Sequence, residues 1–80
     1  MLRVSRETKL SAEEIISLAS DFFGKKGTGL EEESRNECCI SFEGDGGVVI
    51  VSVGEGDGKS SVDIETREWE YQVKEFLGKL

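Results

Sequence analysis

The sequence predicts one α+β domain, a two-layer sandwich in which helices pack on one face of an antiparallel β-meander, in the order β-α-β-β-β-α. Three observations predict this fold. Two segments carry apolar residues at helical spacing, one in each half of the chain, and segments between them alternate apolar and polar residues. Stretches rich in glycine and aspartate separate the alternating segments, as hairpin turns require. Eighty residues suffice for one core, so the predicted domain spans residues 1–80.

The first element is an edge strand from Leu2 to Leu10. Leu2, Val4, Thr8 and Leu10 fall on one side of it, and charged or polar residues fall on the other. Arg6 lies on the apolar side and interrupts the pattern, which places this strand at an edge rather than in the centre of the sheet.

A helix follows at Ser11. Ser11 and Glu14 have the spacing of a capping box, and Leu10 with Ile15 supplies the accompanying hydrophobic contact. Its apolar stripe is Ile15, Ile16, Ala19, Phe22 and Phe23. Gly24 is expected to end the helix in a left-handed conformation. Gly27–Gly29 is expected to continue as a loop, with Leu30 turned back toward the core and Glu31, Glu32 and Glu33 solvated.

Three strands in meander order come next. In the first, Cys38, Ile40 and Phe42 are expected to face the helices, while Glu37, Cys39, Ser41 and Glu43 face away. The middle strand runs from Val48 to Val53, and in the last Val62, Ile64 and Thr66 face inward. Hairpin turns are predicted at 44–47 and 54–58, where Asp-Gly and Gly-Gly accept positive φ.

The closing helix carries its apolar residues on a single face: Trp69, Val73, Phe76, Leu77 and Leu80. Tyr71 falls on the opposite side and is expected to be exposed.

Composition argues against several classes of function. Seventeen acidic residues against ten basic ones give a net charge of −7, which repels phosphate backbones and anionic membranes. We therefore expect no nucleic-acid and no membrane partner. The absence of histidine removes the usual base at neutral pH and the commonest metal ligand, so neither an enzyme nor a metal site or cofactor is expected.

The N-terminal residues lack the apolar stretch of a secretory signal, and the two cysteines, Cys38 and Cys39, are adjacent. Neighbours on a strand point to opposite faces, so a structural bridge between them is not expected. A reduced, cytoplasmic location is the resulting prediction.

Two motifs resemble ligand sites. Residues 54–60 (GEGDGKS) resemble a phosphate loop, but Val53 stands where the Walker pattern requires glycine, and a strand is expected to follow. Asp45 and Asp57 suggest calcium, yet a meander places the two turns at opposite ends of the sheet. Both are interpreted as hairpin turns.

The candidate functional surface lies on the strand face that points away from the helices. Alternation places Val48 and Ile50 on this face, with Cys39 beside them, whereas the neighbouring strands place acidic and polar residues there. An apolar centre with an acidic rim is typical of a partner-binding surface. The alternative interpretation is that β-branched residues simply favour a central strand.

The sequence of elements, with a helix opened by Ser11–Ile15 and a closing amphipathic helix with an early Trp69, resembles the helix-grip pattern of START-like proteins. The resemblance covers Leu2–Ile15 and Val62–Leu80. It implies a C-terminal helix that grips a curved sheet, with an apolar ligand often enclosed between them.

Two hypotheses on function follow. The first is a non-catalytic protein-interaction module, either binding a protein partner or forming a homodimer through Val48, Ile50 and Cys39. The alternative is a miniature helix-grip-like domain that binds an apolar small molecule between the sheet and the closing helix; the full-sized aromatic residues on the inner face argue for a filled core instead.

Overall fold

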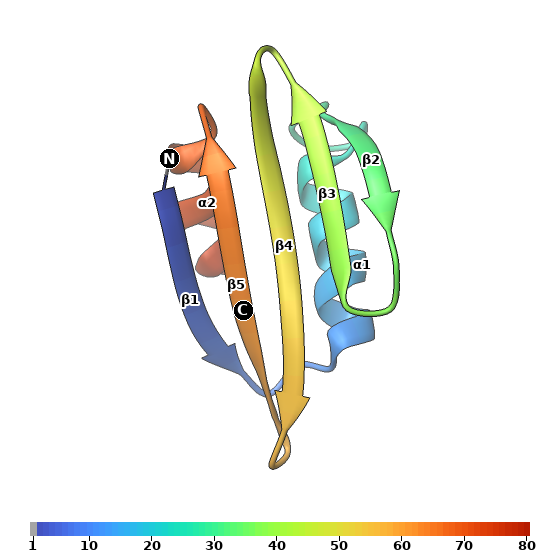
Figure 1. Ribbon diagram of the computed structural model, residues 1–80, viewed down its shortest axis with the longest axis vertical. Coiled ribbons are helices and arrows are strands. Elements are labelled where there is room, and N and C mark those ends of the chain that lie inside the picture. Colours follow the sequence, from blue (N-terminus) through green and yellow to red (C-terminus); the bar gives the residue numbers. More distant parts are fainter. Residues whose placement is uncertain (1) are drawn as a thin grey trace.

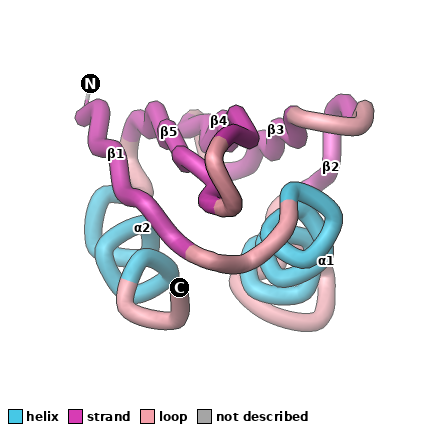
Figure 2. The backbone as a smooth tube through the Cα atoms, turned by 90° about the horizontal axis from the view of Figure 1, so that it is seen from below, coloured by secondary structure: helices cyan, strands magenta, loops and turns pink. Residues whose placement is uncertain are grey.

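The computed structural model describes residues 2–80 and confirms the α+β class: one open antiparallel sheet with both helices on one of its faces (Figures 1 and 2). Seen along the strands, the sheet forms one layer, and α1 and α2 lie side by side in the other (Figure 2). In chain order the elements are β1 (Leu2–Thr8), α1 (Ala12–Phe23), β2 (Glu31–Arg35), β3 (Cys39–Gly44), β4 (Gly47–Gly56), β5 (Lys59–Arg67) and α2 (Glu70–Leu77).

The strands lie in the order β1-β5-β4-β3-β2, so the meander from β2 to β5 is continuous and β1 closes its far edge. Leu2 lies opposite Thr66, and Thr8 lies opposite Ser60. β1 is thus the edge strand that its interrupted alternation predicts. The hairpins between β3 and β4 and between β4 and β5 turn at Asp45-Gly46 and Asp57-Gly58, where all four residues have positive φ.

Strand β2 was not among the predicted elements. All five of its residues, EEESR, are exposed, so no alternation marks it as a strand. It pairs with the outer edge of β3, with a register shift between Glu32 and Ser34. Charged, irregular edge strands of this kind discourage pairing with a further chain.

The predicted capping box of α1 is present. The Glu14 amide donates to the Ser11 hydroxyl, and the Ser11 amide donates to the Glu14 carboxylate, both at 3.1 Å. A third amide at the start of the helix, that of Ala12, donates to the Glu55 carboxylate on β4 at 3.2 Å. Gly24 ends the helix as predicted, but its backbone is extended rather than left-handed. Glycine is needed there for space, because a Cβ would lie 2.4 Å from the Ser20 carbonyl oxygen.

Arg6, the charge on the apolar side of β1, reaches the C-terminal end of α2. Its Nη1 donates to the Leu77 carbonyl oxygen at 3.0 Å. The carbonyls of the last helical turn lack partners within the helix and carry the negative end of the helix dipole. The residue that breaks the alternation of β1 therefore joins the N-terminal strand to the C-terminal helix.

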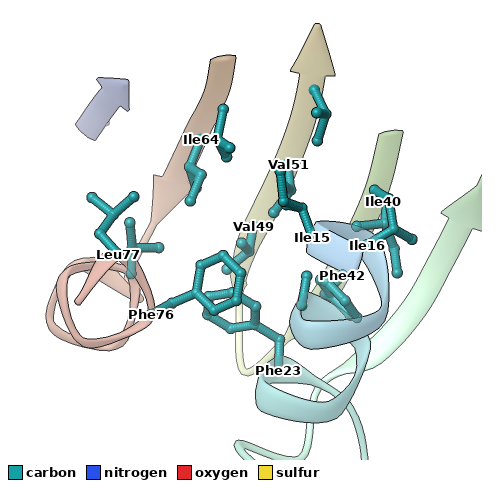
Figure 3. Close-up of a cluster of buried hydrophobic side chains, with 14 of the residues drawn as sticks. Ile15, Ile16, Phe23, Ile40, Phe42, Val49, Val51, Ile64, Phe76 and Leu77 are labelled. Carbon is teal, nitrogen blue, oxygen red and sulfur yellow. The ribbon is translucent and has the colours of Figure 1, made fainter. Parts of the chain in front are cut away.

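The core fills the space between the sheet and the two helices (Figure 3). Phe23 from α1 and Phe76 from α2 are fully buried, with ring centroids 5.2 Å apart, and Phe23 also lies 5.5 Å from Phe42 of β3. The inward residues of the central strands complete the core: Ile40, Val49, Val51, Val53, Val62 and Ile64.

Trp69 precedes the first turn of α2 and is half-buried against this core. Its indole Nε1 donates to the Gly44 carbonyl at 3.1 Å, which ties α2 to the hairpin between β3 and β4. Gly47 makes room for the indole, because a Cβ there would lie 2.8 Å from Nε1.

Candidate functional site

The candidate surface, called the outer patch below, consists of Val48, Ile50 and Cys39. All three belong to the face of the sheet opposite the helices, which no element among residues 2–80 covers (Figure 2). Ile50 is 38% exposed, and Val48 and Cys39 are half-buried by their strand neighbours. The alternation expected from the sequence therefore places these residues as predicted.

Cross-strand neighbours surround the patch with polar and charged groups. Ile50 lies between Ser41 of β3 and Glu65 of β5. Val48 lies between Glu43 and Arg67 in the same way. Directly opposite residues in an antiparallel pair share a face, so all of these side chains border the patch.

The rim also contains basic residues that the expectation of an acidic rim did not include. Arg3 of β1 lies 3.6 Å from the Glu65 carboxylate, and Arg67 lies opposite Val48. The acidic residues still outnumber the basic ones on this face: Glu7, Glu31, Glu43, Asp63 and Glu65 against Arg3, Lys59 and Arg67. The patch is thus a small apolar centre in a predominantly acidic surround.

The two cysteines lie differently from the prediction. Cys38 was expected to face the helices from a strand, but β3 begins only at Cys39, and Cys38 is exposed in the turn before it. Asn36 causes the turn: its Oδ1 accepts from the amides of Cys38 at 3.0 Å and of Cys39 at 2.9 Å. The two Sγ atoms consequently lie 3.4 Å apart instead of on opposite faces.

The contact between the thiols affects their acidity. The hydrogen bond with Cys39 raises the pKa of the Cys38 thiol above its ordinary value, and the charges of Cys39 and Glu37 act in the same direction. Cys38 is thus held as the neutral thiol to a higher pH than an isolated cysteine. A neutral thiol is a poor nucleophile.

The space proposed for an apolar ligand, between the sheet and α2, is occupied by side chains. Phe22 lies 5.6 Å from Phe76 and 5.0 Å from Phe23, measured between ring centroids. A cleft with a volume of about 520 Å³ lies elsewhere, beside the first turns of α1. It is open and exposes polar and apolar surface in about equal parts, lined in part by Ala12, Ile16, Arg35, Asn36, Glu37 and Glu55.

Residues 54–60 do not form a phosphate-binding loop, and Asp45 and Asp57 do not form a calcium site. The chain turns at Asp57-Gly58 and continues directly into β5, so no helix N-terminus follows the glycine-rich stretch. Asp45 and Asp57 lie at opposite ends of the sheet, since they occupy the two successive hairpin turns of β4 (Figure 1). Within residues 2–80, no group of three or more cysteine or acidic side chains is arranged to hold a metal ion. None of the helices there is long and apolar enough to span a membrane.

Comparison of the chain with known protein families found no matching family, and comparison with curated proteins found no matching sequence.

Proposed function

We propose that the domain is a non-catalytic interaction module that self-associates through the outer patch. One observation carries the proposal: Ile50, a large apolar side chain 38% exposed, lies near the centre of a sheet face that neither helix covers. Tyr71 is the other large hydrophobic residue exposed in the described chain, but it lies on α2, away from this face.

A two-fold arrangement suits this surface. In an isologous pair each copy presents the same residues, so the two patches meet at the centre and the charged rims meet at the edge. Ile50 and Val48 of each copy would then lose their remaining contact with water. Sheets that pack face to face use alternate residues of each strand in this way.

The rim determines how association depends on salt. Because acidic residues outnumber basic residues on the face, two identical rims repel each other. Added salt screens charges that are exposed and more than a few ångströms apart. Self-association is therefore expected to strengthen between low salt and about 0.5 M salt.

Ile50→Lys tests the proposal. Fully burying an exposed isoleucine contributes ~1.5–3 kcal/mol, so the exposed 38% of Ile50 contributes roughly 0.6–1.1 kcal/mol per copy and about twice that for the two copies of a dimer. Since ~1.4 kcal/mol corresponds to a tenfold change in affinity, the variant should associate roughly tenfold more weakly in sedimentation-velocity experiments across a wide concentration range. Circular dichroism establishes that it remains folded.

Tyr71→Lys is the matched control, since it places the same charge at an exposed apolar position outside the patch. It should associate as the wild type does. A wild type that stays monomeric at millimolar concentration would contradict the proposal and favour the interpretation that Val48 and Ile50 reflect only the β-propensity of a central strand.

The small-molecule alternative and the helix-grip resemblance stay predictions. The aromatic packing between Phe22, Phe23 and Phe76 does not favour an apolar ligand beneath α2.

A further inference from the structure

We propose that Cys38 and Cys39 form a dithiol site that binds one monosubstituted trivalent arsenical through both sulfur atoms. This inference goes beyond the proposed self-association and does not depend on it. Both side chains are at least partly exposed, and their Sγ atoms lie 3.4 Å apart, so one atom can bridge them without displacement of the backbone.

Four hydrogen bonds hold the backbone of the pair. Besides the two amides bound by the Asn36 side chain, the Cys39 carbonyl accepts from the Asn36 amide at 2.9 Å. The Cys38 carbonyl accepts from the Val53 amide at 2.7 Å, which anchors the turn to β4. A ligand that needs both sulfurs therefore meets them already positioned, and positioning reduces the entropic cost of binding.

The number of ligands favours trivalent arsenic over a transition metal. A structural zinc site requires four protein ligands, and no third cysteine or acidic side chain within residues 2–80 joins the pair in a metal-binding group. Trivalent arsenic is pyramidal and forms three bonds. An arsenical with one organic substituent leaves two bonds for sulfur, which is the number that this site offers.

A direct disulfide fits the site less well. Adjacent Cα atoms are ~3.8 Å apart, below the usual separation of ~4.4–6.8 Å in disulfides, so the bond would be strained. Thiol–disulfide exchange also requires a thiolate, and the raised pKa of Cys38 lowers the fraction of that thiol present as thiolate.

Arsenical binding needs neither a thiolate nor an oxidant. In water the arsenical carries two hydroxyl groups. Each thiol forms one S–As bond, and its proton leaves with one arsenic-bound hydroxyl as water. Two water molecules are released, and arsenic remains trivalent.

Phenylarsine oxide is the probe. Intact-mass spectrometry should show one adduct per wild-type chain, equal to one phenylarsenic group less two hydrogens. The adduct should survive excess glutathione, a monothiol, and be removed by dithiothreitol, a dithiol. Attachment through two linked groups typically strengthens binding by ~10²–10⁴-fold over one.

Cys38→Ser and Cys39→Ser should each therefore bind the probe at least about 100-fold more weakly in competition with glutathione. Asn36→Ala keeps both thiols but removes the side-chain acceptor that holds them together, so it should bind with intermediate affinity. Trp69 fluorescence checks that each variant is folded.

Equal affinities for the wild type and both single-cysteine variants would refute the proposal, because the second sulfur would then contribute nothing. Ile50→Lys, which is designed to remove self-association, should bind the probe at least as tightly as the wild type, because Cys39 belongs to the outer patch and stays uncovered in the monomer. The two proposals can therefore fail independently.

Discussion

Replacing Phe76 with alanine removes the aromatic ring through which α2 contacts α1. The side chain is fully buried, and its ring lies 5.2 Å from Phe23 and 5.6 Å from Phe22. Phenylalanine-to-alanine changes in cores cost ~3–5 kcal/mol. A domain of this length is stabilised by roughly 4–12 kcal/mol in total, so the loss is a large fraction of its stability.

Urea unfolding monitored by fluorescence is the assay, because the chain has a single tryptophan and Trp69 is half-buried against the core. Tyr71→Ala is the control on the same helix, since Tyr71 is 70% exposed; it should change the free energy of unfolding by less than about 0.5 kcal/mol. If Phe76→Ala destabilises the domain no more than Tyr71→Ala, then α2 does not pack on the sheet as described.

Three further changes test local features. Ser11→Ala should lower the free energy of unfolding by ~0.5–2 kcal/mol, and Ser11→Gly by less, in the same assay; equal stability of the alanine variant would mean that the capping box contributes nothing. Arg6→Met should cost about 0.3–1 kcal/mol because it removes the cation at the Leu77 carbonyl, and repeating the urea titration at high salt should shrink the difference. Cys39→Ala removes the largest cause of the raised pKa of Cys38, so the pH at which iodoacetamide alkylates Cys38 at half its maximal rate should fall; an unchanged pH profile would contradict the thiol contact.

The sequence predicted the features that depend on residues a few positions apart. The capping box at Ser11 and the Asp-Gly turns involve residues close together in the sequence, and both are present. Alternation likewise placed Ile50 on the uncovered face, because inward and outward positions on a strand differ by one residue.

The features that sequence reasoning missed depend on partners distant in the sequence or on side-chain turns. The residues of β2 form a strand because β3 offers an open edge, and nothing in EEESR shows this. The role of Arg6 requires α2 to lie beside β1, since Leu77 is 71 positions away. For the cysteines, Asn36 was the available signal: asparagine two residues before an amide commonly forms a side-chain turn, which overrides strand alternation.

The pairing of β1 with β5 has a consequence for folding. Ser5 donates to Asp63 across this pair, and the two residues are 58 positions apart, whereas the hairpins of β3, β4 and β5 join near neighbours. Non-local pairs form late because a long loop must close first. At a synthesis rate of ~5–20 residues per second, Ser5 is added to the chain roughly 3–12 s before Asp63.

During that interval β1 is an unpaired strand. Its three charged residues, Arg3, Arg6 and Glu7, reduce the tendency of such a strand to pair with other chains. Arg6, which binds the C-terminal end of α2 in the folded domain, is thus also one of the charges that disfavour pairing of the nascent strand with other chains.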